Sequence, residues 1–228
     1  MYTLRPWVDI NKLNWNLLSL NKNAINLLNK NFNKINWDYL SINRNAIDIL
    51  TSYKHKINWD NLAFNKNCYY LLLTHPDKIN WTNISVNENC IPIIKNNLEK
   101  INWKYLSQNS NAINLLINKY KLINWARLSL NKNAIELLEN NSNKIYWKYL
   151  SCNENATLLI KNNLDKISWS YLALNPNPEI ITLLENNPDK INWKLLSRNS
   201  NALHLLEKNL DKINYDVISA NPNIFIIE

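Results

Sequence analysis

The stretch INWDYLSINRNAIDIL at residues 35–50 contains the pattern that decides the fold. Its tryptophan belongs to a series that runs from Trp15 to Trp169 in steps of 22 residues. Trp193 follows after a step of 24, and Tyr215 takes the same place 22 residues later. A fixed short period is typical of repeat proteins, in which each unit stacks on its neighbours and buries a continuous core. We therefore expect ten units in one elongated body.

The repeats fill most of the chain of 228 residues, and no change of composition marks a linker. We expect a single domain over residues 1–228, with an N-terminal cap over residues 1–13 and tandem repeats over residues 14–228, the last of them incomplete. The chain contains no Gly. We therefore expect Asn at turns and helix ends, where Gly normally supplies unusual backbone angles.

Apolar, small and Asn residues recur at fixed places in each unit, counted from the tryptophan as position one. Position four is Leu or Ile, position five is Ser or Ala, and positions seven and nine are Asn in all ten units. An Asn just before the tryptophan, such as Asn36, is expected to cap a first short helix, and the Asn at position seven, such as Asn43, a second. Pro176 and Pro222 follow such an Asn, where proline fits the first turn of a helix. We expect the second helix to end at an Asn in left-handed conformation, as at Asn141.

Helices this short are unstable alone, so stacking is expected to supply their stability. We predict a core of Trp at position one, Leu at four and fourteen, and Ile at eleven and twenty-one. Positions seven and nine are identical in every unit, whereas a surface that binds one partner should vary. The invariant asparagines therefore indicate a structural ladder between units.

A leucine-rich-repeat-like solenoid is the alternative fold, because Trp37, Leu40 and Asn45 fit its signature and its period can be 22 residues. It would place position six in a buried strand, yet Gln108 and Arg198 occupy that position. We therefore predict an all-α fold, an α-solenoid or superhelix of about ten 22-residue repeats with two short helices each.

The segments INWDYLSINRNAIDIL (35–50) and NPDKINWKLLSRNSNALHLLEKN (187–209) resemble the asparagine-rich tandem repeats of nucleocytoplasmic giant DNA viruses. The shared pattern is I-[ND]-W-x-x-L-S-x-N-x-N-A-I-x-L-L, and it covers residues 11–228 with departures at Tyr146 and Tyr215. The resemblance implies a viral repeat protein and brings no catalytic residues with it. A viral protein of this kind is expected in the host cytoplasm or in the virion.

The chain carries no motif that predicts an enzyme or a cofactor. His55, His75 and His204 lie in different units without metal-ligand spacing, and a Gly-rich phosphate loop requires Gly. Cys68 and Cys90 replace the small residue at position ten in adjacent units, so we expect buried thiols too far apart for an unstrained disulfide. We therefore predict a non-enzymatic protein without cofactor or metal.

Lysine occupies position twenty in most units, and the net charge of the chain is +8. Stacking should align these lysines in a stripe that could follow a phosphate backbone. Neighbouring carboxylates such as Asp77 and Asp189 dilute the field, and a lysine near a helix C-terminus also offsets the helix dipole. We favour this structural role and keep nucleic acid as the alternative partner. The candidate polyanion stripe comprises Lys34, Lys56, Lys78, Lys100, Lys144, Lys166, Lys190 and Lys212.

The C-terminal end carries the most specific prediction of a binding site. The chain stops inside the tenth unit, and Phe225, Ile226 and Ile227 follow without a polar cap. We expect this end to pack on a partner protein, on a second copy or on the chain's own last groove. The predicted function is a scaffold for protein–protein interaction, with a nucleic-acid-binding solenoid as the alternative. No segment resembles a signal peptide or a membrane span, so we expect an intracellular protein without membrane contact.

Overall fold

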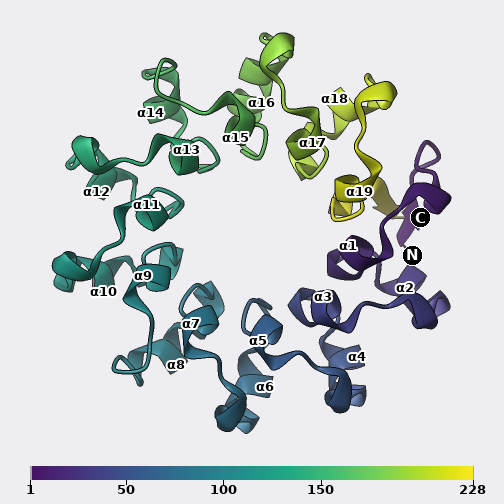
Figure 1. The fold of residues 1–228 in the computed structure, drawn as a ribbon, viewed down its shortest axis with the longest axis horizontal. Helices are drawn as coiled ribbons and strands as arrows, with labels where there is room; N and C mark the ends of the chain where they lie inside the picture. Colours follow the sequence, from purple (N-terminus) through teal and green to yellow (C-terminus); the bar gives the residue numbers. More distant parts are fainter. Residues whose placement is uncertain (1, 228) are drawn as a thin grey trace.

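The structure is a computed structural model that describes residues 2–227 and consists almost entirely of short helices (Figure 1). Each unit contributes one inner and one outer helix, except that the described part of the tenth unit has no outer helix. The predicted all-α solenoid of repeated helix pairs is confirmed, and the leucine-rich-repeat alternative is wrong because the units contain helices where that fold needs strands. The inner helices are α1 (Trp15–Leu20), α3 (Trp37–Ile42), α5 (Trp59–Leu62), α7 (Trp81–Ile84), α9 (Trp103–Leu106), α11 (Trp125–Leu128), α13 (Trp147–Leu150), α15 (Trp169–Leu172), α17 (Trp193–Leu196) and α19 (Tyr215–Ile218). The outer helices are α2 (Ile25–Lys30), α4 (Ile47–Ser52), α6 (Tyr69–Thr74), α8 (Ile91–Lys95), α10 (Ile113–Asn118), α12 (Ile135–Glu139), α14 (Thr157–Lys161), α16 (Pro178–Glu185) and α18 (Leu203–Glu207).

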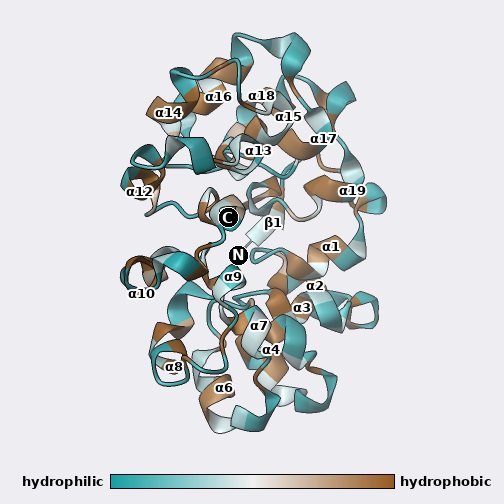
Figure 2. Cartoon of the chain, turned by 60° about the vertical axis from the view of Figure 1, so that its left-hand side comes forward, coloured by the Kyte–Doolittle hydropathy of each residue, from teal (hydrophilic) through white to brown (hydrophobic). Residues whose placement is uncertain are grey.

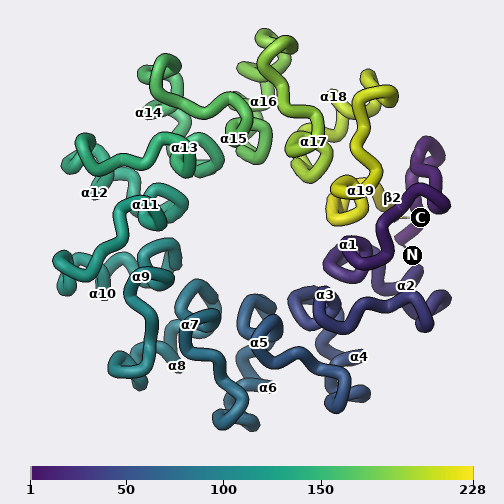
Figure 3. The backbone as a smooth tube through the Cα atoms, viewed as in Figure 1, coloured from purple at the N-terminus to yellow at the C-terminus, as the bar shows by residue number. Residues whose placement is uncertain are grey.

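The ten units close into a ring. Figure 1 shows the inner helices arranged around the centre and the outer helices along the circumference. In the tube of Figure 3, the purple N-terminal end lies beside the yellow C-terminal end, with the other units forming a continuous circle between them. The predicted elongated body is therefore wrong, because each unit turns relative to the one before and ten such turns bring the last unit to the first.

Asparagine caps both helices of a unit, in two different ways. The side chain of Asn36 accepts a hydrogen bond from the backbone N–H of Tyr39 and caps α3 as predicted. Asn43 accepts instead from the N–H of Asn45, and the turn that it stabilises leads into α4, which begins at Ile47. In four units this turn is a 3₁₀ helix: η5 (Glu88–Cys90), η6 (Ser110–Ala112), η10 (Ser200–Ala202) and η12 (Pro222–Ile224).

The outer helices do not end in a left-handed residue. Among residues 2–227, no non-glycine residue has a positive φ, so this prediction is wrong. Asn141 has a φ of −137° and its side-chain amide donates to the carbonyl of Leu137, one turn back in α12. The amide thereby satisfies a carbonyl that the end of the helix leaves free, and the left-handed conformation is not needed. The same contact is made by Asn31, Asn97, Asn163, Asn187 and Asn209.

A short 3₁₀ turn carries the chain back from the outer layer to the next inner helix in most units. These turns are η1 (Ile10–Lys12), η2 (Phe32–Lys34), η3 (Lys54–Lys56), η4 (Pro76–Lys78), η7 (Tyr120–Leu122), η8 (Ser142–Lys144), η9 (Pro188–Lys190) and η11 (Leu210–Lys212). The two-residue insertion before Trp193 is absorbed by α16, which is longer than the other outer helices, and the ring continues without interruption.

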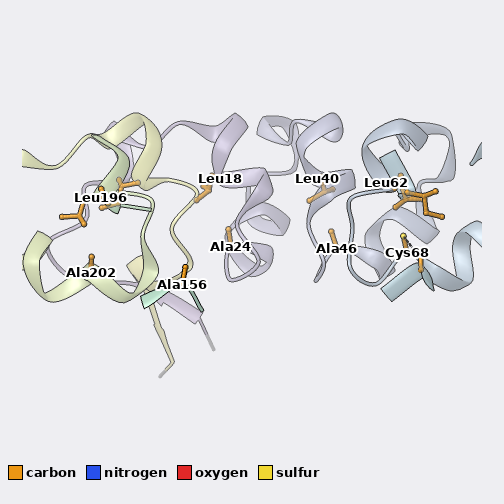
Figure 4. Close-up of a cluster of buried hydrophobic side chains, with 14 of the residues drawn as sticks. Leu18, Ala24, Leu40, Ala46, Leu62, Cys68, Ala156, Leu196 and Ala202 are labelled. Carbon is orange, nitrogen blue, oxygen red and sulfur yellow. Dashed lines mark hydrogen bonds between the residues drawn. The ribbon is translucent and has the colours of Figure 1, made fainter. Parts of the chain in front are cut away.

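The core runs around the ring between the two helical layers. Leu at position four, Ala or Cys at position ten and Leu at position fourteen are fully buried, as Leu40, Ala46 and Leu50 illustrate. Figure 4 shows Leu18, Leu40 and Leu62 in one row with Ala24, Ala46 and Cys68 in a second row beside it. Each buried Leu stabilises the fold by about 1.5–3 kcal/mol. In Figure 2, brown hydrophobic stretches recur in the helices around the ring, and the connections are mostly teal and hydrophilic.

The tryptophans are only half-buried and pack against the core, whereas the prediction made them part of it. Trp37 and Trp103 pack against the buried cluster from its edge. The indole ring is too large for the gap between two inner helices, where the Ser or Ala at position five allows close approach. This position is fully buried, as at Ser41 and Ala63.

A buried asparagine at position seven joins every unit to the one before it. The side-chain amide of Asn43 donates to the backbone carbonyls of Ser19 and Asn21, at 2.9 Å each, while its oxygen accepts from the N–H of Asn45. Asn45 at position nine donates to the carbonyl of Lys22 at 2.9 Å. The predicted ladder is confirmed, since the equivalent bonds connect all ten units.

The same ladder crosses the seam between the tenth unit and the first. The amide of Asn21 donates to the carbonyls of Ser219 at 3.0 Å and Asn221 at 2.8 Å, and Asn23 donates to Pro222 at 2.9 Å. The backbone N–H of Asn14 donates to the hydroxyl of Ser219, as Asn36 does to Ser19 elsewhere. The seam is therefore built like the other nine interfaces in its inner layer.

In the outer layer of the seam, two strands replace the missing helix of the tenth unit. Strand β1 (Tyr2–Leu4) pairs antiparallel with β2 (Phe225–Ile227), with Tyr2 opposite Ile227 and Leu4 opposite Phe225. The N-terminal segment then passes through η1 and completes the tenth unit up to α1. Residues 2–13 are thus part of a unit shared between the two ends of the described chain, and not a separate cap.

We expect Asn109→Ala to destabilise the ring far more than Asn111→Ala. Asn109 is buried and donates to the carbonyls of Ser85 and Asn87, each at 3.0 Å, so its removal leaves the Ser85 carbonyl without this partner, whereas the Asn87 carbonyl keeps the N–H of Cys90. Each buried group left unsatisfied costs about 1–3 kcal/mol. Asn111 is exposed and donates once, to Glu88, so water replaces the lost bond. Urea unfolding followed by circular dichroism measures both losses, and equal losses would contradict the structural role of position seven.

A circular permutant tests the closure of the ring. We expect a chain that begins at Asn141 and ends at Asn140, with residues 228 and 1 joined by a short Gly-rich linker, to fold with the helical content of the unpermuted chain. The linker then closes a hairpin between β2 and β1, whose outer residues lie opposite each other. In an open solenoid the same linker would have to span the whole stack. Loss of cooperative thermal unfolding in the permutant would refute the closed ring.

Candidate functional site on the inner wall of the ring

The C-terminal apolar residues close the ring and do not form a free docking surface. Phe225, Ile226 and Ile227 make up β2. Phe225 is 5% exposed and lies opposite Leu4, whereas Ile227 is 74% exposed. Of the three expected partners of this end, the structure shows the chain itself, although the contact is with the N-terminal strand and not with the last groove. The side chain of Arg5 secures the contact by donating to the backbone carbonyl of Asn223 at 2.8 Å.

Most lysines of the candidate stripe lie over the aromatic ring at position one of their own unit. The ammonium nitrogen of Lys190 is 4.2 Å from the ring centre of Trp169, and that of Lys12 is 5.1 Å from the ring centre of Tyr215 across the seam. A cation at this distance from an aromatic face is stabilised by the ring quadrupole. The same contact joins Lys34 with Trp15, Lys100 with Trp81, Lys144 with Trp125 and Lys166 with Trp147.

The remaining stripe lysines have no aromatic ring beneath them among residues 2–227. Lys78 and Lys212 form ion pairs with the carboxylates of the preceding Asp77 and Asp211, at 3.2 and 3.3 Å. The stripe thus holds the half-buried indoles in place between units. This packing role differs from the predicted interaction with helix dipoles.

The side chains at positions six and eight form a surface that we call the inner wall. These positions follow the inner helices, and residues from many units converge there. One depression of about 250 Å³ is lined by residues from Lys66 in unit three to Pro176 in unit eight. A second, of about 300 Å³, is lined by residues of units ten, one, two and three. Side chains from so many units can share one depression only on the concave side of the ring, so the inner wall faces its centre.

Charges on part of the inner wall are paired between neighbouring units. Lys66 lies 3.4 Å from Glu88, and Lys132 lies 3.1 Å from Glu154. Burial by itself would raise the pKa of the Glu88 carboxyl, but the hydrogen bond from Ser110 and the charge of Lys66 lower it. The hydrogen bond and the charge of Glu154 raise the pKa of Lys132. In this part of the wall, each of the two lysines is therefore neutralised by a glutamate of the next unit.

Basic residues without a carboxylate partner occupy the inner wall of units one and two. Lys22 and Arg44 at position eight form no ion pair with any of residues 2–227. Burial, followed by the charge of Arg44, lowers the pKa of Lys22. The sequence analysis missed this surface, because one unit does not reveal which side of the stack is concave. A run of cations at position eight, Lys22, Arg44 and Lys66, was the available signal.

An apolar pocket of about 280 Å³ lies in the outer layer between units three and four. Tyr69, Leu73, Trp81, Pro92 and Lys100 line part of it. In this region α8 is followed by an irregular turn, as α14 is, where most other units have a 3₁₀ turn. The lining of the pocket is mostly apolar, with Asn96, Asn97 and Lys100 among its polar residues.

The predicted buried thiols are confirmed at Cys68 and Cys90, whose sulfur atoms lie 3.8 Å apart without a disulfide. The hydrogen bond with Cys90 and then burial raise the pKa of the Cys68 thiol. His75 packs on Trp59 at 4.9 Å, and His204 contacts the carboxylate of Glu185 at 2.9 Å. The described residues contain no group of three His, Cys, Asp or Glu side chains placed to hold a metal ion.

Comparisons with known proteins found no relative: no protein-family model, curated protein or solved structure matches the chain. Among residues 2–227, no helix is both long and apolar enough to cross a membrane. The function must therefore be argued from the inner wall itself.

We expect Lys190→Met to lower the free energy of unfolding by about 0.5–1 kcal/mol, the range of an exposed cation–π contact. Met keeps an apolar stem on Trp169 but removes the charge. Lys56→Met is the matched control, since it removes the same charge from the same position without an aromatic ring beneath it among the described residues. Guanidinium unfolding monitored by tryptophan fluorescence distinguishes the two. Identical midpoints for the two variants would argue against a packing role for the stripe.

Proposed function

We propose that the ring is a non-enzymatic scaffold that binds a partner protein along its inner wall. The observation that carries the proposal is the contrast between framework and wall. Positions four, seven and nine keep the same residue types around the ring, whereas positions six and eight change from unit to unit. Position six holds Phe64, Gln108 and Arg198 in three different units. A concave wall with variable side chains on a uniform framework is the usual binding surface of solenoid proteins.

The composition of the inner wall supports a protein partner over nucleic acid. Leu20, Ile42 and Leu130 are half-buried apolar residues on the wall, and Glu88 and Glu154 carry negative charge beside them. Apolar contacts with mixed charges are typical of protein interfaces, whereas a phosphate backbone requires continuous positive charge. The lysines at position twenty offer fewer free positive charges to a phosphate backbone, because most of them already lie on aromatic rings. We further propose a role in a viral particle or in the host cytoplasm, which is supported only by the resemblance of the repeats.

Site-specific photo-crosslinking tests the scaffold. A photoreactive amino acid replaces Leu130 on the inner wall or, as a control, Glu136 on the outer helix α12, and each protein is irradiated in an extract of the cells that produce it. We expect a discrete protein adduct from the inner-wall position that survives nuclease treatment and high salt. Adducts that form only at the outer position, or that disappear with nuclease, would overturn the proposal.

A further inference from the structure

The inner-wall depression at the seam combines an apolar floor with two unpaired cations. Leu20, Ile42 and Phe64 at position six supply the floor, and Phe64 is 37% exposed. Lys22 and Arg44 at position eight stand beside it. Ala220 and Pro222 of unit ten complete the lining together with Lys66, and the depression has a volume of about 300 Å³. We call this site the seam depression.

Electrostatics distinguish the seam depression from the rest of the inner wall. Lys66 and Lys132 each have a glutamate of the next unit as partner, at 3.4 and 3.1 Å. Arg44 and Lys22 in consecutive units have none among residues 2–227, and Arg44 disfavours the charge of Lys22. Lys22 is half-buried and Arg44 is exposed beside it, and two like charges that repel each other are stabilised by an anion placed between them. The missing carboxylate is therefore expected from outside the chain.

We propose that the seam depression binds an acidic segment of a partner protein, with apolar side chains between its carboxylates. The proposal rests on the proposed function and assigns it a site and a partner chemistry. Carboxylates would pair with Arg44 and Lys22, and the intervening apolar side chains would cover Leu20, Ile42 and Phe64. A guanidinium pairs well with the planar carboxylate group, and burial of the floor adds the hydrophobic contribution. Nucleic acid fits less well, because Glu88 adjoins the depression and Phe64 is its single aromatic side chain.

The site is complete only when the ring is closed. Ala220 and Pro222 come from one end of the chain, and Leu20 and Lys22 come from the other. The Asn ladder across the seam brings them together, since Asn21 and Asn23 donate to the backbone of unit ten. A segment bound across the seam therefore stabilises the closed ring by mass action.

A defined peptide tests the partner chemistry. The probe is a fluorescein-labelled peptide of eight residues that alternates Leu and Glu, titrated against the full chain at low salt and followed by fluorescence anisotropy. We expect saturable binding that weakens with salt. Two control peptides should bind at least about tenfold more weakly. The peptide that alternates Leu with Lys reverses the charge, and the peptide that alternates Ser with Glu removes the apolar side chains. Equal binding of all three peptides, or stronger binding of an oligothymidylate of equal charge, would overturn the proposal.

Charge-matched variants locate the site. Lys22→Glu combined with Arg44→Glu should weaken binding of the Leu–Glu peptide about tenfold or more. The control combines Lys194→Glu with Lys208→Glu on unit nine, which changes the net charge by the same amount away from the inner wall and outside the depression. Circular dichroism and melting temperature verify that both variants fold. Equal weakening by both pairs would mean a general charge effect and would overturn the assigned site.

A variant with an opened ring tests whether binding needs the closed seam depression or only the basic residues Lys22 and Arg44. A chain that ends at Ile224 and carries Asn21→Ala and Asn23→Ala lacks both β2 and the amide bonds across the seam but retains Lys22 and Arg44. It should lose affinity for the peptide, whereas the circular permutant should retain it. Full affinity of the truncated chain with an opened ring, shown by small-angle scattering, would refute the dependence on closure. If the peptide fails to bind while Leu130 crosslinks to a protein, the acidic partner is wrong and the scaffold stands. If no inner-wall position crosslinks to a protein, the scaffold itself is wrong.

Discussion

The buried asparagine amide at position seven is the interaction on which the rest of the ring depends. Its two N–H groups reach two carbonyls of the preceding unit, and its oxygen caps the turn that leads into its own outer helix, as in Asn43. The amide therefore fixes both the spacing and the relative rotation of adjacent units. Only Asn has this reach with two donors and one acceptor, since Asp lacks the donors and Gln is one methylene longer. An apolar residue in place of Asn43 would leave the carbonyl of Ser19 without this partner in a buried place, while the carbonyl of Asn21 would keep the N–H of Ala24.

Closure follows from the uniformity of that interaction. Each interface repeats the same geometry, so the rotation per unit is nearly constant and the tenth unit meets the first in the right orientation for Asn21 to bond with Ser219 and Asn221. An open solenoid exposes an apolar surface at each end and needs polar caps. The ring buries both surfaces against each other, and the entropy lost by joining the ends grows only slowly with chain length. The strands β1 and β2 then complete the outer layer where the tenth unit has no outer helix among the described residues.

Closure also defines where a partner can bind. The side chains that repeat from unit to unit fill the space between the helical layers. Most of the lysines at position twenty form cation–π contacts, such as Lys190 on Trp169. The inner wall is therefore the surface whose residues can change from unit to unit without disturbing the packing of the core. Its charges are paired between units three and four and between units six and seven, whereas Lys22 and Arg44 at the seam are two neighbouring cations without an ion pair and Arg198 of unit nine is a single one among residues 2–227. Binding and closure therefore depend on the same interface.

The sequence by itself determined the unit, and only the tertiary structure decided the ring. The pattern of apolar and capping residues specifies every feature that depends on spacing within 22 residues. These features are the period, the helix starts at residues such as Asn36, the burial of Leu40 and the ladder through Asn43. The rotation between units depends on how side chains of two units pack, and a small change in it separates an open superhelix from a closed circle. That rotation also determines that Lys22 and Pro222, 200 residues apart, line one depression. For this reason the candidate site could not be predicted from the repeat, whereas the residues that build its framework could.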